Sequence, residues 1–287
     1  MKNVAGAGSR WVDVSAERFP GWIASFARRH ADPAALGVPA ALAVTVNDGG
    51  AVFTAQDGSL ADCRAPFPES LAPLPADAGP EETARLIAAH ASAPRAVGVL
   101  LVRLGGYAAG VFAGYPPALA DAKTGSRPVH GRSAAGGWSQ HRFARRREKQ
   151  ANEALGAAAD AVVAVFGRWE SGIAGPDARW QKPPSYRASG PALSPGGTTP
   201  RPPRMSPPAT AGRNEQRKSG EAEWGRQLDA VVLGGDKRAV AELSGDPRLA
   251  RYLALATERF ITVPDPKRAV LEGTPRLFAS VRIRLTG

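Results

Sequence analysis

The stretch from residue 170 to residue 225 constrains the fold most, because it cannot contribute to a packed core. Prolines recur through it among Gly, Ser, Thr and Arg, and apolar side chains are sparse. Ordering the backbone costs roughly 1–2 kcal/mol per residue, which such a composition cannot offset by burial. We therefore expect residues 169–225 to form a disordered insertion between two parts of one α/β domain, residues 1–168 and 226–287.

Apolar residues outside this insertion recur at the spacings of helices and strands. A helix is expected after Ser15, where Phe19, Trp22, Ile23 and Phe26 share one face. Two hairpins are expected, one joining 41–46 to 51–54 and one joining 96–103 to 107–113. Further helices are expected at 80–90, about 140–166, 238–243 and 252–257, and strands at 228–233 and 280–285. This order predicts an α/β fold with a mixed sheet flanked by helices.

The positive charge of the chain is confined to two segments. The formal net charge is +7 over residues 123–149 and +4 over residues 170–226, and together these account for the whole formal net charge of +11. A localised basic segment favours a nucleic-acid partner, although a solvated helix face would also be charged. The cations of the first segment are the candidate RNA-binding residues: Lys123, Arg127, Arg132, Arg142, Arg145, Arg146, Arg147 and Lys149.

Several classes of protein are disfavoured by what the chain lacks. Cys63 is the single cysteine, so no internal disulfide can form, and the scattered His30, His90, His130 and His141 have no zinc-ligand spacing. We expect no metal and no cofactor. The longest aliphatic run, 97–102, is too short to span a bilayer. The sequence thus predicts a soluble, cytoplasmic monomer that does not bind membranes.

A small-residue loop precedes the basic helix and ends in Gly136-Gly137-Trp138-Ser139-Gln140. Glycines let a backbone approach a crowded ligand closely. The Gln140 amide can position a water or a sugar hydroxyl but cannot act as an acid or base near neutral pH, so catalysis would rest on geometry and electrostatics. A polar turn into a helix capped by Ser139 would also explain the string. Trp138 and Phe143 could stack on a base or anchor the loop.

The run LADAKTGSRPVHGRSAAGGWSQHRFARRREKQANEAL resembles the glutamine loop and following helix of the Vms-like release-factor family, which has shorter actinobacterial members. That family is similar to the catalytic middle domain of archaeal and eukaryotic peptide-chain release factors. The resemblance covers residues 1 to about 168 and 226–287. Three further runs also resemble actinobacterial members: Trp11-Val12, Asp121-Ala122-Lys123 and Leu233-Gly234-Gly235-Asp236.

This resemblance implies an RNase H-like α/β fold and hydrolysis of the ester that joins a nascent peptide to tRNA on a stalled large ribosomal subunit. Gln140 would be the catalytic glutamine, in a loop of about residues 123–140 that includes Gly136, Gly137, Trp138 and Ser139. The implied partners are the large ribosomal subunit, peptidyl-tRNA and rRNA. Trp138-Ser139 separates the glycines from the glutamine, unlike the Gly-Gly-Gln of termination factors. The chain also lacks a stop-codon-reading module, which favours rescue without a codon.

Other readings of these residues stay open. The protein could be a noncatalytic RNA- or ribosome-binding protein whose loop fits an RNA groove. A metal-dependent nuclease would need clustered carboxylates, and the aspartates Asp48, Asp57, Asp62 and Asp160 show no paired spacing. His141 could act as a general base, but RNA contact or a structural role is favoured because it follows Gln140 at the helix start. Residues 234–237 could cradle phosphate, yet a strand-to-helix turn fits better.

Overall fold

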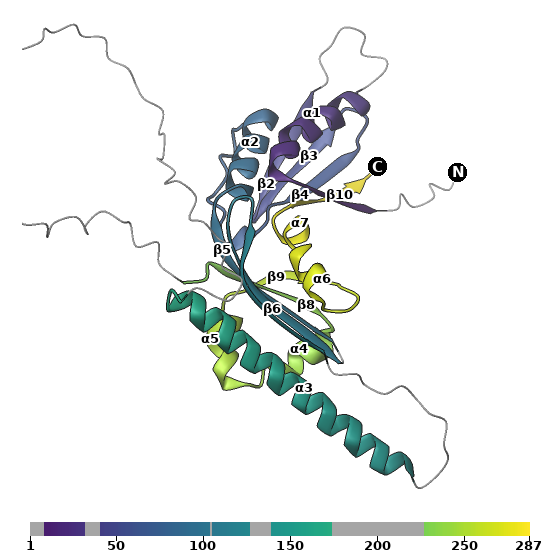
Figure 1. The fold of residues 1–287 in the computed structure, drawn as a ribbon. Coiled ribbons are helices and arrows are strands. Elements are labelled where there is room, and N and C mark those ends of the chain that lie inside the picture. Colours follow the sequence, from purple (N-terminus) through teal and green to yellow (C-terminus); the bar gives the residue numbers. More distant parts are fainter. Residues whose placement is uncertain (1–8, 32–40, 104, 127–138, 174–226) are drawn as a thin grey trace, which may run out of the picture.

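The computed structural model describes residues 9–31, 41–103, 105–126, 139–173 and 227–287, and of residues 139–151 it describes the backbone alone. These residues form two five-stranded sheets with helices packed on them (Figure 1). The predicted disordered insertion, 169–225, lies almost wholly outside the described residues. Its first residues are an exception, because Trp169 and Glu170 belong to the preceding helix and not to the insertion.

The first sheet is antiparallel throughout, with the strand order β1-β10-β4-β3-β2. Its strands are β1 (Arg10–Val14), β2 (Leu42–Asn47), β3 (Gly50–Ala55), β4 (Leu60–Arg64) and β10 (Val281–Thr286). The helices α1 (Phe19–Arg29) and α2 (Pro80–Ala91) cover one face and bury Phe19, Ile23 and Ile87 against Phe53 and Ile283. The last strand of the chain, β10, thus pairs with two early strands, β1 and β4, and joins them into one sheet.

The second sheet is mixed, with the strand order β7-β6-β5-β8-β9. An antiparallel meander supplies β5 (Arg95–Arg103), β6 (Gly106–Gly114) and β7 (Ala118–Ser126). The later strands, β8 (Ala230–Gly235) and β9 (Ala256–Ile261), then add in parallel on the other side of β5. This order and these directions are those of an RNase H-like sheet, so the predicted fold class is confirmed.

Helices cover both faces of the second sheet (Figure 1). One face packs against α3 (Ser139–Glu170), α4 (Lys237–Leu243) and α5 (Ala250–Leu253), with Val162, Phe166, Val240 and Tyr252 in the core. The short helices α6 (Arg268–Glu272) and α7 (Pro275–Phe278) cover the other face through Leu271 and Phe278. A sheet that is buried on both faces explains the nearly continuous apolar run in β5.

The structure corrects several sequence-based expectations. The sequence predicts the β2–β3 hairpin and the helices α1 and α2, but it predicts a single mixed sheet, whereas this hairpin belongs to a separate antiparallel sheet. The helix expected at 252–257 is wrong, because α5 ends at Leu253 and Ala256 already begins β9. Branched and aromatic residues in Ala256–Ile261 suit a strand that pairs with β8. Gly234 and Gly235, expected as a turn, are the last residues of β8.

Candidate functional site: the glutamine loop and the basic helix

The two ends of the predicted glutamine loop are a strand of the second sheet and a long helix. The strand β7 continues to Ser126, so Lys123 belongs to the strand and not to the loop. At the other end, Ser139 and Gln140 are the first two residues of α3. The loop residues between them lie outside the described residues, and these include Arg127, Arg132, Gly136, Gly137 and Trp138.

The helix α3 carries Gln140 and the basic residues away from the sheet. Its 32 residues correspond to about 48 Å at a rise of 1.5 Å per residue. Gln140 therefore lies about 21 Å along the axis from Ala154, where the helix meets β6 and β7. In Figure 1 the first half of α3 extends beyond the edge of the sheet. Four of the predicted cations occupy positions three and four residues apart along this part of the helical backbone: Arg142, Arg145, Arg146 and Lys149.

Lys123 is the predicted RNA-binding residue whose side chain the structure describes. It is exposed and pairs in register with Ala109 of β6. Ala109 packs in the core under α3, so Lys123 lies on the sheet face that α3 covers. The strand therefore presents this cation on the same side of the sheet as the basic helix.

A partly buried ion pair between Arg168 and Asp121 fixes the helix to the strand that enters the loop. Asp121 of β7 is 3% exposed. The Arg168 guanidinium donates from Nε and Nη2 to its two carboxylate oxygens, at 2.8 and 3.1 Å. A bidentate pair of this kind holds both groups in one orientation. The β7 strand and the second half of α3 are therefore held in a fixed relation, which sets where the loop begins and where its helix is anchored.

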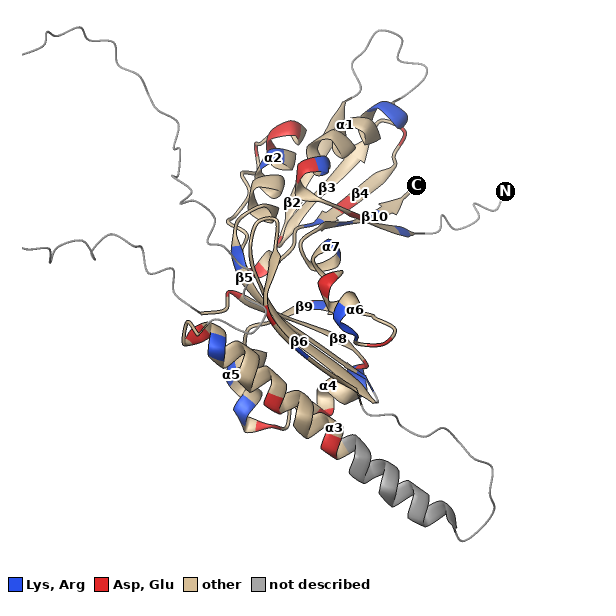
Figure 2. Cartoon of the chain, viewed as in Figure 1, with Lys and Arg blue, Asp and Glu red and all other residues tan. Residues whose placement is uncertain are grey.

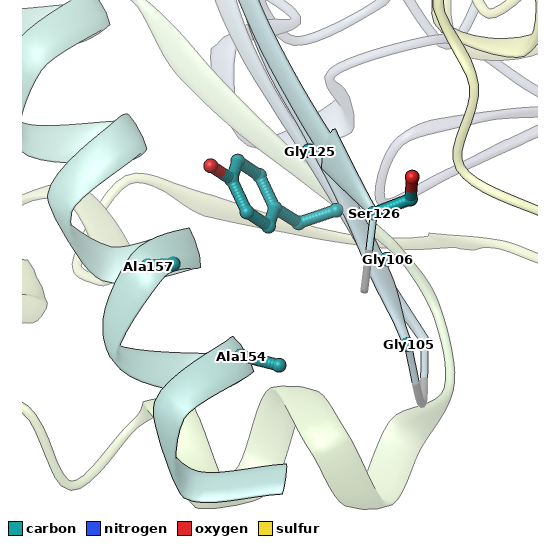
Figure 3. A pocket seen from close by; sticks show the side chains of 7 residues that line it. Gly105, Gly106, Gly125, Ser126, Ala154 and Ala157 are labelled. Atoms are coloured by element: carbon teal, nitrogen blue, oxygen red, sulfur yellow. The ribbon is translucent and has the colours of Figure 1, made fainter. Parts of the chain in front are cut away.

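A shallow pocket of about 170 Å³ lies at the base of the loop, between the end of β7 and α3 (Figure 3). Small residues line most of it, from the start of β6 and the turn before it, from the end of β7 and from α3: Gly105, Gly106, Gly125, Ser126, Ala154 and Ala157. The seventh lining residue, Tyr107, packs its ring over Gly125, where an added Cβ would lie 2.5 Å from the ring. Gly125 is therefore required by its cross-strand neighbour. None of these seven residues is a carboxylate, histidine, lysine or arginine.

The aspartates considered for a nuclease are dispersed over the molecule. Asp57 binds His30 at 2.8 Å, Asp62 binds Arg284 at 3.0 Å, and Asp160 binds Arg248 at 2.7 Å. Asp48 lies in the turn between β2 and β3. Among the residues that the structure describes, no three His, Cys, Asp or Glu side chains come together as metal ligands. A two-metal mechanism has no site in this part of the chain.

Residues 234–237 and Cys63 both have structural roles. Residues 234–237 join β8 to α4: Gly234 and Gly235 end the strand, and the Asp236 carboxylate accepts a hydrogen bond from the backbone N–H of Arg238 at 2.8 Å and caps the helix. Gly235 has a φ of +99°, and an added Cβ would meet the Val102 carbonyl. Cys63 is buried in the core of the first sheet. Burial raises the pKa of its thiol, which keeps it protonated and unreactive.

No described helix combines the length and the apolar character needed to cross a membrane. Fold and site together define an RNase H-like protein in which a loop of the mixed sheet leads into a long helix with a basic first half. The family of Actinobacteria/chloroflexi VLRF1 release factors matches residues 95–179 and 210–284, more than half of the chain, so the protein belongs to this family. Curated proteins offer no match.

The family match covers the second sheet, α3 and all but the end of β10, whereas β1 to β4 and their helices precede it. Membership establishes a release-factor-like role in translation, with the ribosome as the partner. The resemblance to Vms-like release factors predicted from the loop and the helix is thereby confirmed.

Proposed function

We propose that the protein is a peptidyl-tRNA hydrolase that frees nascent chains from tRNA on stalled large ribosomal subunits without reading a codon. The observation that carries this proposal is the placement of Gln140 on the first turn of α3, in a chain that belongs to a release-factor family. Gln140 is at the start of the basic helix, about 21 Å along the axis from the part of that helix that packs on the sheet. It can therefore enter a narrow RNA site while the domain stays outside.

In this mechanism Gln140 orients the water that attacks the ester carbonyl. An amide can donate one hydrogen bond and accept another, but it does not take up the proton of the water. The 2′-hydroxyl of the terminal adenosine of the tRNA assists, and the products are a peptide with a free carboxylate and a tRNA with a free 3′-hydroxyl.

The cations of α3 supply the binding energy that positions the amide. Between residues 142 and 149 the sequence has one acidic residue, Glu148, and five basic ones: Arg142, Arg145, Arg146, Arg147 and Lys149. Like charges at these steps weaken an isolated helix by a few tenths of a kcal/mol per pair, and phosphates of rRNA or of the tRNA acceptor end would offset that cost. Lys123 adds one exposed cation on the same side of the sheet.

Release of peptide from purified large subunits loaded with peptidyl-tRNA tests the proposal. Gln140→Ala should lower the single-turnover rate by roughly a hundredfold or more, because one oriented polar group is lost at the reacting centre. Binding to the subunits should stay within about twofold. Gln150→Ala removes the same side chain further along α3 and should retain the wild-type rate.

The two candidate functions give opposite results in this assay. A noncatalytic ribosome-binding protein would bind the subunits in a salt-dependent manner and release no peptide at any concentration. Full release by Gln140→Ala would keep the hydrolase but remove Gln140 from its site. Release that needs added magnesium and cuts the RNA would indicate the nuclease.

A further inference from the structure

The first sheet has a face that α1 and α2 do not cover. The two helices pack on the side that holds Val14, Phe53 and Ile283 (Figure 1). On the other side, exposed residues of neighbouring strands align in register, with Trp11 opposite Arg284 and Arg282 opposite Arg64. We call this surface, made of Trp11, Arg64, Arg282 and Arg284, the open face; the exposed Thr45 and Asn47 of β2 lie further along the same side of the sheet, beyond β3.

An aromatic ring and two guanidinium groups meet at one edge of the open face. Trp11 is 44% exposed, which is unusual for so large an apolar side chain in a packed sheet. The Arg282 guanidinium lies over its ring at 4.4 Å from the centroid, and that of Arg284 is at 5.9 Å. Arginine stacked on tryptophan presents a flat, positively charged platform. A nucleic-acid base can stack on such a platform whatever its sequence.

The cations of the open face are more accessible than most of the anions beside them. Arg284 is 49% exposed, whereas its partner Asp62 is 16% exposed. Asp13 is engaged by Arg259 of β9 at 2.6 Å. Arg64 is well exposed and has a loose contact of 3.9 Å with Glu258, an exposed anion at the border of the face. A ligand that approaches the open face therefore meets an indole and three guanidinium groups, and Glu258 is the most exposed of the three carboxylates near them.

We propose that the open face binds a single-stranded segment of RNA, with one base stacked on Trp11 and the backbone phosphates on Arg64, Arg282 and Arg284. Arg282 and Arg284 are two residues apart on one strand, about 6.8 Å, so they can reach successive phosphates of an extended strand. A peptide partner would need apolar side-chain pockets or a free strand edge, and the open face offers a charged, nearly flat surface. This contact goes beyond ester hydrolysis and uses a sheet whose other four strands precede the family match.

Binding of a labelled twelve-nucleotide uridine oligomer to the full chain tests this proposal. The comparison is made in a background with Arg145→Gln, Arg146→Gln and Arg147→Gln, which reduces binding by the basic helix and separates this contact from the proposed function. Trp11→Ala should weaken binding at least about fivefold, and Trp11→Phe should retain most of it, because the stacking surface remains. The dependence of log affinity on log salt concentration should become shallower by roughly one for each of Arg282→Gln and Arg284→Gln. Glu258→Gln should strengthen binding.

The matched control is Arg85→Gln. Arg85 is an exposed arginine of α2, so the substitution removes the same charge from the helix layer on the other side of the same sheet and should change affinity by less than twofold. Equal affinities of Trp11→Ala and Arg85→Gln would overturn the proposal. The proposal would also be overturned if hydrogen exchange in β1 and β10 were slowed by a ribosomal protein but not by the oligomer. A photocrosslink from thiouridine in the oligomer to β1 or β10 would support it.

Discussion

The two halves of α3 differ in what their side chains contact. The second half packs on the sheet through Ala158, Ala161, Val162, Val165 and Phe166. Its charges have protein partners: Arg168 binds Asp121, Asp160 binds Arg248, and Glu170 binds Arg251 at 2.8 Å. Acidic residues outnumber basic ones along this half (Figure 2). The first half carries the cations and Gln140 beyond the sheet. One helix thus separates the residues that stabilise the fold from those of the proposed site.

Phe166→Ala should break the packing of the second half and have the largest effect on stability. The ring is fully buried and meets Tyr252 edge to face at 5.1 Å. Removing a buried aromatic ring costs about 3–5 kcal/mol, because the surrounding residues fill the cavity only partly. Urea unfolding of both proteins measures the change. Gln150→Ala, in the first half, should alter the free energy of unfolding by less than about 0.5 kcal/mol. A similar cost for both variants would contradict the comparison.

Arg168→Leu should lower the free energy of unfolding by about 3 kcal/mol, because it leaves the buried Asp121 carboxylate without a counter-ion. A double-mutant cycle with Asp121→Asn isolates the pair. We expect the double variant to be more stable than the sum of the single losses implies, since no unpaired charge remains in it. Additive losses would mean that the two residues contribute separately and that the pair does not fix α3 to β7.

The triple variant Arg145→Gln, Arg146→Gln, Arg147→Gln tests the first half. If these cations contact phosphates, the dependence of log affinity for large subunits on log salt should become shallower by about 2 to 3. The free energy of unfolding should stay within about 0.5 kcal/mol of the wild type. Arg238→Gln removes one exposed arginine of α4 and serves as the control, with an unchanged slope. An unchanged slope in the triple variant would remove the basic helix from the ribosome contact.

Local patterns predicted the parts of this fold that depend on neighbouring residues. The hairpin of β2 and β3 follows from alternating residues around Asn47–Gly50, and the burial of the second half of α3 follows from its apolar spacing. The RNase H-like topology came from the resemblance of the loop and helix and not from periodicity. The strand β4, which reads Leu-Ala-Asp-Cys-Arg, is short and half polar, so its sequence does not indicate a strand. It is extended because it pairs with β10 on one side and β3 on the other.

The contacts that organise the site join residues far apart in the chain. Asp121 and Arg168 are 47 residues apart, and Trp11 meets Arg282 from the opposite end of the sequence. No local pattern indicates such a pair, because each residue has an ordinary surrounding in the sequence. An aspartate within an apolar strand was the available signal for Asp121, since a buried carboxylate needs a cation or hydrogen-bond donors. The identity of that cation required the structure.

Gly156→Ala should have the smallest effect and the opposite sign. Gly156 lies where the two halves of α3 meet, and an added Cβ would contact nothing within 4 Å. Alanine in place of an interior helix glycine stabilises by roughly 0.5–1 kcal/mol. Gly98→Ala is the contrasting variant, because its Cβ would lie 2.7 Å from Cζ of Phe166 and should destabilise. If the two halves act independently, Gly156→Ala will raise the urea midpoint and leave the peptide-release rate unchanged. A slower release rate in that more stable variant would show that the helix must bend at Gly156 for the first half to reach its site.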